Sequence, residues 1–320
     1  SYNTHYNNLR PREYDGSFLR FPGMNPEISL RPHQRNAVAR ILFGGNTLVA
    51  HSVGAGKTMV MGAAAMEKKR LGLCNKTLII VPNHLTEQMG SELLSLYPNA
   101  NILVSTRHDF EKNRRKLFCS RIATGNYDIV IMGHSQFSRI PLSSERQQKF
   151  LQDEIERYTQ EIASAKKEKS GQDLTIKQME ATKKRLQSHL EELMDSPKDD
   201  VVTFEQLGVD SLMVDEAHEF KNLAVTTKMQ NVAGISTSES QKATDLLMKT
   251  QYLDEITGGR GLVFCTGTPI SNSPVELYTM MRYLQASTLR AHDLLSFDAW
   301  AANFGQTTTS IELAPEGTGY

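Results

Sequence analysis

The chain has 320 residues, of which 39% are hydrophobic and 22% are charged, and its formal net charge is zero. This balance is typical of an ordinary globular protein with one large or two medium domains. It excludes a membrane-spanning protein, because no apolar run approaches the roughly 20 residues that cross a bilayer. Three scattered cysteines (Cys74, Cys119 and Cys265) and no secretory signal favour a reducing, cytoplasmic setting and do not indicate a zinc site.

The zero net charge hides an uneven distribution along the chain. Residues 1–142 contain 18 Lys or Arg residues against 9 Asp or Glu residues, whereas residues 201–320 contain 7 against 14. A basic excess of this kind can follow a nucleic-acid backbone, although the acids interleaved with it also fit a solvated helix face. Its densest part supplies three candidate phosphate contacts: Arg114, Arg115 and Lys116.

The first motif in chain order follows an apolar, β-prone run at 47–50. Residues 53–58 read Val-Gly-Ala-Gly-Lys-Thr and precede a stretch that is typical of a helix. A strand, a glycine-rich turn and a helix N-terminus surround an anion with backbone N–H groups. Lys57 would reach the β- and γ-phosphates of a nucleotide, and the Thr58 hydroxyl would bind Mg²⁺. The expected nucleotide-binding residues are Gly54, Ala55, Gly56, Lys57 and Thr58.

The general phosphate-loop pattern has one more glycine, at the position of His51. Because of this departure, a glycine-containing turn without a ligand remains an alternative. Lys57 and Thr58 directly after two glycines, between a strand and a helix, favour the phosphate loop.

Apolar, β-prone runs alternate with helical patterns along the rest of the chain. This alternation predicts an α/β fold in which helices cover both faces of a parallel sheet. The expected strands lie near 47–50, 77–81, 102–104, 128–132, 211–214 and 262–265.

One segment interrupts the alternation. Between 143 and 205, apolar residues recur at spacings of three and four in two runs, with a turn at 169–173. This pattern predicts two antiparallel helices that form a coiled-coil hairpin, with a first arm roughly 35–40 Å long. The hairpin is either an arm for a partner or a nucleic acid, or a purely structural elaboration.

An acid motif, Asp215-Glu216-Ala217-His218, follows the expected strand at 211–214. Two acids at the carboxyl end of a parallel strand lie where open α/β sheets bind ligands. Asp215 would hold Mg²⁺, and Glu216 would orient and deprotonate the water that attacks the γ-phosphate. The alternative is a plain helix N-terminus, where the helix dipole favours acids.

Two further motifs flank this set: Leu30-Arg31-Pro32-His33-Gln34-Arg35 before the first strand, and Thr266-Gly267-Thr268-Pro269 after the last. Together the motifs resemble the first RecA-like lobe of superfamily-two helicases and translocases, specifically the Swi/Snf-type group. In that group the first loop glycine is usually replaced, as His51 replaces it here, and Lys-Asn follows the acid motif, as in Lys221-Asn222. The likeness covers roughly 28–300 without the hairpin. The chain also resembles the helicase portion of large phage or integrative-element proteins.

The resemblance implies roles for individual residues. Gln34 would read the adenine edge, although it could also be a solvated helix residue. Asn83 would contact a nucleic-acid backbone, or cap the helix that follows it. The expected coupling residues are His218, Thr266, Gly267 and Thr268. The expected nucleic-acid contacts, besides the basic run, are Asn83, His84, His134 and Ser135.

The resemblance also implies an ATPase that uses ATP and Mg²⁺ and moves on double-stranded DNA, with no membrane partner. Such motors need a second RecA-like lobe with arginines for the γ-phosphate, and only Arg282 and Arg290 follow Pro269. We therefore expect a fragment of a longer protein, which can also carry a methylase, that binds nucleotide but hydrolyses it poorly.

The expected parts are a lead-in at 1–28, a RecA-like lobe at 29–142 and 206–300, the hairpin at 143–205, and the start of a following segment at 301–320. Two other functions remain open. One is the motor part of a restriction- or methylase-type complex, and the other is a degenerate nucleotide-binding scaffold.

Overall fold

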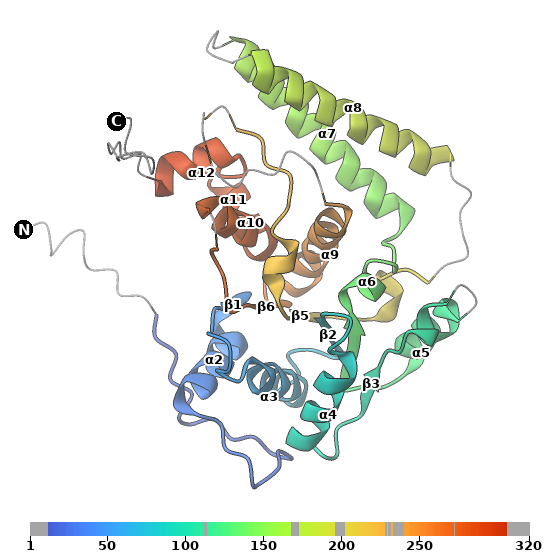
Figure 1. The fold of residues 1–320 in the computed structure, drawn as a ribbon, viewed down its shortest axis with the longest axis vertical. Helices are drawn as coiled ribbons and strands as arrows, with labels where there is room; N and C mark the ends of the chain where they lie inside the picture. The colour runs from blue at the N-terminus through green and yellow to red at the C-terminus, as the bar shows by residue number, and fades with distance from the viewer. Residues whose placement is uncertain are drawn as a thin grey trace, which may run out of the picture.

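A computed structural model describes residues 12–111, 114–167, 173–195, 202–227, 229, 232, 240–271 and 273–305. Within them, one parallel sheet has the strand order β1-β6-β5-β2-β4-β3 (Figure 1). Its strands are β1 (Thr47–Val49), β2 (Thr77–Val81), β3 (Ile102–Val104), β4 (Ile129–Gly133), β5 (Ser211–Val214) and β6 (Leu262–Cys265). This confirms the predicted α/β fold with a parallel sheet, since every strand lies within about one residue of its predicted ends.

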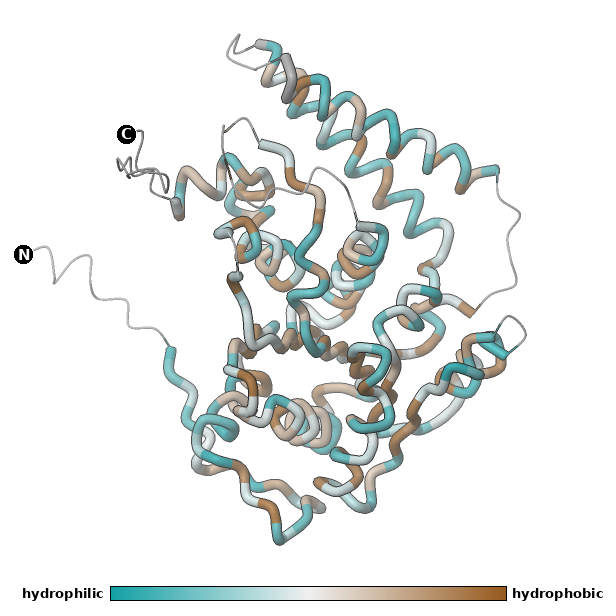
Figure 2. The backbone as a smooth tube through the Cα atoms, in the orientation of Figure 1, coloured by the Kyte–Doolittle hydropathy of each residue, from teal (hydrophilic) through white to brown (hydrophobic). Residues whose placement is uncertain are grey.

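The sheet is buried on both faces because its strands carry apolar side chains on both. In β2, Leu78 and Ile80 belong to one core and Ile79 and Val81 to the other, and all four are fully buried. Figure 2 shows these central strands as a hydrophobic layer. One face packs on α2 (Pro32–Gly44), α3 (Lys57–Arg70) and α4 (Thr86–Leu96). The other packs on α5 (Arg115–Thr124), α6 (His134–Phe137), α9 (Gln241–Thr257) and α10 (Pro274–Leu284).

Short elements complete the described part of the chain: η1 (His108–Phe110), η2 (Glu205–Leu207), η3 (Ala217–Phe220), α11 (Ala286–Ala291) and α12 (Phe297–Phe304). An apolar cluster joins α10, α11 and α12 around Tyr278, Phe297 and Trp300. The sequence did not predict α12, because so short a helix gives no clear 3.6-residue period. None of the helices in the described part is long and apolar enough to cross a bilayer.

The insertion contains two long helices, as predicted: α7 (Ser144–Lys167) and α8 (Asp173–Asp195). They lie side by side and run in opposite directions (Figure 1), and Lys166 Nζ lies 2.7 Å from Glu180 Oε1. Coiled-coil packing between them remains a prediction, and residues 168–172 of the expected turn region lie outside the described residues. Leu151 and Tyr158 of α7 are buried in the same core as the sheet, so the first arm packs on the lobe.

The described part of the lead-in, residues 12–28, has no regular element; it contacts α2 first and then reaches the end of α4, where the Asn25 N–H donates to Leu96 O at 2.8 Å. The Arg35 guanidinium donates hydrogen bonds to the carbonyl oxygens of Gly16, Ser17 and Leu19. A Cβ atom at Gly16 would lie 2.1 Å from the Arg35 carbonyl oxygen, so this close approach requires glycine. The segment therefore braces the helix that carries the candidate adenine-reading residue.

Lys249 in α9 is fully buried, and its ammonium donates to Phe137 O at 2.8 Å and to Asp245 Oδ2 at 2.7 Å. We predict that Lys249→Met destabilises the protein by about 3–5 kcal/mol, because Asp245 then keeps a buried charge without its partner. The double variant Lys249→Met/Asp245→Leu should recover most of this loss, since it removes both charges. Free energies of unfolding from urea titrations measure both effects, and a single variant as stable as the wild type would contradict the prediction.

Candidate functional site at the carboxyl edge of the sheet

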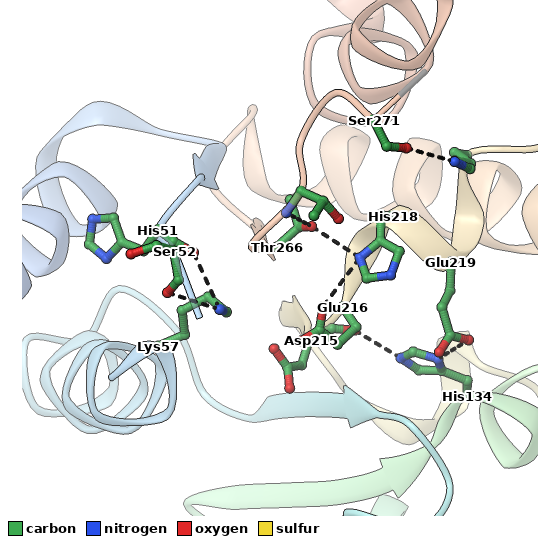
Figure 3. Close-up of polar contacts among 12 residues, drawn as sticks. His51, Ser52, Lys57, His134, Asp215, Glu216, His218, Glu219, Thr266 and Ser271 are labelled. Atoms are coloured by element: carbon green, nitrogen blue, oxygen red, sulfur yellow. Dashed lines mark hydrogen bonds and ion pairs between the residues drawn. The ribbon is translucent and has the colours of Figure 1, made fainter. Parts of the chain in front are cut away.

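The carboxyl ends of three neighbouring strands form the candidate site. β6 lies between β1 and β5, with Val49 paired to Cys265 and Val214 paired to Phe264. Because the strands are parallel, the segments that follow them leave the sheet at one edge. Figure 3 shows residues of all three segments at this edge. These segments are the glycine-rich loop at 53–58, called the phosphate loop here after its sequence pattern, the acid motif at 215–218 and the Thr-Gly-Thr-Pro motif at 266–269.

The phosphate loop turns sharply before α3. Gly54 and Gly56 have left-handed φ angles of 81° and 77°, which glycine adopts without steric cost. Lys57 begins α3, and its ammonium donates to the carbonyl oxygens of His51 at 3.3 Å and Ser52 at 3.5 Å. The free N–H groups of the first helical turn and a lysine therefore meet at one point, an arrangement that suits an anion.

Gln34 holds the phosphate loop from α2. It is 7% exposed, its Nε2 donates to Ala55 O at 3.0 Å, and its Oε1 accepts from the Arg31 N–H at 2.8 Å. The alternative of a solvated helix residue is therefore wrong. His33 also contacts Ala55 O, and its ring lies edge-on to the ring of His51, which occupies the place of the missing glycine. Burial, followed by neighbouring positive charge, lowers the pKa of His51.

Asp215 and Glu216 follow β5 into the site. Asp215 is 8% exposed, and burial together with the charge of Glu216 raises its pKa to about 6, although the charge of Lys57 opposes this shift. Glu216 has a left-handed φ of 48°, which is uncommon outside glycine and costs energy. The acid motif is thus an electrostatically and conformationally unfavourable arrangement that its surroundings hold in place.

His218 connects the acid motif to the segment after β6. Its Nδ1 lies 3.1 Å from Thr266 Oγ1 and 3.2 Å from Glu216 Oε2. Thr266 is fully buried, and its hydroxyl oxygen also accepts from the Thr268 N–H at 3.0 Å. A Cβ atom at Gly267 would lie 3.1 Å from a methyl group of the phosphate loop. The predicted coupling residues therefore stand between the loop and the acids.

The sequence did not predict a second tie between these segments, which is formed by Lys221, Ser271 and Glu276. Lys221 Nζ donates to Ser271 Oγ and to Glu276 Oε1, both at 2.9 Å, and the Ser271 N–H donates to Glu276 Oε2 at 2.6 Å. Burial raises the pKa of Glu276, but the bonds from Ser271 and Lys221 outweigh it and lower the pKa. The sequence signals were the Lys-Asn pair after the acid motif and the continuation of the Thr-Gly-Thr-Pro motif through Ser271 to Glu276, but neither gave a partner for the lysine.

The segments after β2 and β4 meet beside the acid motif. Asn83 Oδ1 accepts from the Ser135 N–H at 3.1 Å and from the Ser135 hydroxyl at 3.0 Å. Asn83 does not cap α4, whose N-cap residue is Leu85, so that alternative is wrong. Asn83, His84 and Ser135 are exposed, and they remain predicted nucleic-acid contacts.

His134 does not lie on this exposed surface. It is 4% exposed, and its ring nitrogens contact Asp215 O and Glu219 Oε2. An imidazole held in this way is not available to a phosphate, so the expected nucleic-acid contact is wrong in this structure. The helical turn that begins at His134 directs this residue inward and Ser135 outward.

The basic run lies at the start of α5, next to the β3 edge of the sheet (Figure 1). Arg114 and Lys116 are exposed, and Arg115 is half-buried. Positive side chains at a helix N-terminus do not stabilise the helix, because they oppose its dipole. Stabilisation of α5 thus does not explain their presence, and these residues stay predicted phosphate contacts.

The comparison with protein families gives a match to the family model "Probable helicase domain" over residues 41–316. The chain belongs to this family. The helicase domain is also 24% identical over 323 residues to "Defense against restriction protein B" of Escherichia phage P1. That alignment covers 88% of the chain but only 14% of the phage protein.

Two solved structures from Sulfolobus solfataricus are similar to the helicase domain at low identity. One is a SWI2/SNF2 ATPase core in complex with dsDNA, with 15% identity, a TM-score of 0.49, and coverage of 90% of this chain and 41% of that one. The other is the SWI2/SNF2 ATPase core domain, with 14% identity, a TM-score of 0.44, and coverage of 92% and 42%.

A pair of glycine variants tests the contact between Gln34 and the loop. A Cβ atom at Gly56 would lie 2.2 Å from Gln34 Nε2, whereas a Cβ atom at Gly54 meets nothing within 4 Å. At either position alanine would have to adopt a left-handed φ, which destabilises both variants by about 1 kcal/mol. We predict that Gly56→Ala destabilises the protein by about 1 kcal/mol more than Gly54→Ala, because it breaks a buried hydrogen bond. Urea unfolding measures the difference, which should vanish in a Gln34→Ala background.

Asp215 should make the stability of the free protein depend on pH. Its pKa of about 6 in the folded state lies above the ordinary value of 3.8, so the folded state binds the proton more tightly. Protonated Asp215 therefore adds about 3 kcal/mol to the free energy of unfolding below about pH 4, and this contribution is lost as the pH rises to about 6. Urea unfolding of the wild type and of Asp215→Asn across this range measures it. Parallel stability curves for the two proteins would contradict the prediction.

Proposed function

We propose that this helicase domain is the nucleotide-binding lobe of an ATP-dependent motor that moves on double-stranded DNA. One observation carries the proposal: Lys57 and Asp215 are far apart in the sequence, yet both follow strands that pair with β6 and face one edge of the sheet (Figure 3). Their charges interact, since Lys57 lowers the pKa of Asp215 against the effect of burial. A lysine at a helix N-terminus opposite a buried acid is the arrangement that polyphosphate and a divalent cation require.

The phosphates of ATP would bind at the start of α3. The backbone N–H groups after Gly54 and Gly56 would surround them, and Lys57 would leave the loop carbonyls for the β- and γ-phosphates. Gln34 would contact the adenine edge. Each end of its amide makes one hydrogen bond within the chain, which leaves one N–H and one lone pair of the carbonyl oxygen for a base.

The residues at this edge also fit Mg²⁺, which prefers oxygen ligands. Thr58, in the first turn of α3, offers a hydroxyl, and Asp215 offers a buried carboxylate whose raised pKa reports an uncompensated negative charge. The described residues contain no group of three or more His, Cys, Asp or Glu side chains that could hold a metal by themselves. Phosphate oxygens and water would therefore supply the other ligands. When bound, Mg²⁺ would neutralise the phosphate charge that develops during hydrolysis.

Glu216 is the proposed base for hydrolysis. Its carboxylate would accept a proton from the attacking water while the water is held in line with the γ-phosphate. His218, 3.2 Å from Glu216 and 3.1 Å from Thr266, would pass changes in the acid motif to the segment after β6. A second RecA-like lobe on the full-length chain would supply the arginine that speeds hydrolysis by about a thousand-fold or more.

Double-stranded DNA would lie along the exposed segments that follow β2 and β4 and on the basic start of α5. Asn83, His84 and Ser135 face solvent there, and Arg114 and Lys116 are also exposed. The N-terminal excess of basic residues supports this side of the lobe as the nucleic-acid side.

The name of the phage P1 relative, a protein of defence against restriction, favours one variant of the proposal. In it, the motor belongs to a larger phage or mobile-element protein that also carries a methylase or acts beside restriction enzymes. A DNA methylation assay of the full-length protein separates this variant from a free-standing translocase. A degenerate scaffold is disfavoured, because Lys57, Thr58, Asp215 and Glu216 are all present.

The Lys57→Ala variant tests nucleotide binding in the chain itself. Wild-type protein should be stabilised by about 3–4 kcal/mol when MgATP is present at 100 to 1,000 times its dissociation constant. Lys57→Ala should lose most of this stabilisation, whereas Lys177→Ala, an exposed lysine on α8, should keep it. Thermal unfolding with and without MgATP measures the effect. A wild-type protein that MgATP does not stabilise would contradict the proposed function.

A further inference from the structure

His134 joins two parts of the sheet edge that are not neighbours. It follows β4, and β2 separates β4 from β5 in the sheet. Its ring nevertheless reaches the acid motif after β5, where Nε2 lies 3.0 Å from Asp215 O (Figure 3). The ring also packs edge-on against Phe220, with 4.9 Å between the ring centroids. A carbonyl oxygen can only accept, so Nε2 carries a proton and donates to Asp215.

The other ring nitrogen is engaged as well. His134 Nδ1 lies 3.2 Å from Glu219 Oε2, and the Lys242 ammonium lies 3.2 Å from the same carboxylate oxygen. Burial lowers the pKa of His134, and a neutral imidazole carries a single ring proton, so with Nε2 as the donor to Asp215 the Nδ1 atom only lies against the Glu219 carboxylate. The bond to Asp215 and the edge-on contact with Phe220 hold the ring in one orientation, and Glu219 and Lys242 border its other side.

The hydrogen bond to the Asp215 carbonyl also restricts the backbone conformation on both sides of that carbonyl. This carbonyl belongs to the peptide plane between Asp215 and Glu216, so its direction is coupled to ψ of the first residue and φ of the second. On the other side, the Asp215 N–H donates to Ile80 O in β2 at 2.9 Å. The backbone of Asp215 is therefore held at both ends, and the hydrogen bond from His134 opposes relaxation of the left-handed φ at Glu216.

The residue after His134 faces the opposite way. Ser135 is exposed and donates twice to Asn83, on the face that we propose for DNA. The backbone here is rigid, because the Gly133 N–H donates to Gln136 Oε1 at 2.8 Å and Gly133 packs closely on Asn83. One short stretch of backbone thus connects the exposed face to the acid motif.

From this geometry we propose that His134 is a positioning residue. It orients the Asp215–Glu216 peptide, and with it the metal-binding and water-activating carboxylates, and it links them to the Asn83–Ser135 face. This inference rests on the proposed function, because it assigns those carboxylates to Mg²⁺ and water. A histidine that only fills the core would stabilise the fold without affecting how the site responds to a cation.

The test uses ATP binding to this chain, measured by thermal unfolding with Mg²⁺ and with EDTA in its place. His134→Phe keeps an aromatic ring against Phe220 but removes the hydrogen bond to Asp215 and the polar contact with Glu219. We expect it to lower the Mg²⁺-dependent gain in ATP affinity by about tenfold or more, as loss of a residue that orients a metal ligand does. Affinity for ATP in EDTA should stay within about twofold, because the phosphate loop is intact. His134→Gln, which keeps an amide donor, should restore part of the gain.

His108→Phe is the matched control, because His108 makes a similar contact with Glu111, at 2.8 Å, but on the protein surface. It should leave both affinities unchanged. If His134→Phe does not fold, Glu219→Ala replaces it, since Glu219 is partly exposed and alanine removes the side chain that borders Nδ1 of the imidazole. Glu219→Ala should then reduce the Mg²⁺-dependent gain several-fold.

The outcomes separate the two claims. A wild-type protein that does not bind ATP contradicts the proposed function. If the wild-type protein shows a Mg²⁺-dependent gain that His134→Phe, or Glu219→Ala in its place, leaves unchanged, the positioning role is overturned and His134 is a structural residue only.

Discussion

Parallel pairing of β6 with both β1 and β5 is the constraint on which the candidate site depends. Lys57 and Asp215 share no local contact that would bring them together, so their positions follow from the register of three strands. Apolar side chains on both faces of these strands fix that register, because a slip by one residue would exchange the two cores. The chemistry at the edge is therefore specified by packing inside the sheet.

Several features that cost free energy lie at this same edge of the sheet, and the rest of the fold offsets their cost. A carboxylate with a raised pKa and a left-handed backbone at Glu216 lie in the segment after β5, and a half-buried His51 with a lowered pKa lies in the segment after β1. The surrounding hydrogen bonds from Gln34 and His134 keep each segment in one conformation. Free energy from the buried sheet thus maintains an arrangement that a short peptide would not adopt.

Much of this architecture is readable from the sequence because its signals are local. Uninterrupted apolar runs mark buried parallel strands, and the phosphate loop lies in six consecutive residues. The partners of single polar residues are not readable in this way. The inward turn of His134, the hydrogen bond from Ser135 to Asn83 and the hydrogen bond from Lys221 to Glu276 depend on which strand ends become neighbours. Short helices such as α12 are also hard to predict from the sequence, since its eight residues show too little of the 3.6-residue period.

The hairpin of α7 and α8 has a mechanical consequence. Leu151 and Tyr158 complete the core that also contains Phe264 of β6, so excising the hairpin would leave that core open to water. The Thr226 hydroxyl, just beyond the acid motif, donates to Glu161 of α7 at 3.3 Å. The first arm is consequently joined to the core that holds β6, so a displacement of α7 would act on the strand that lies between Lys57 and Asp215.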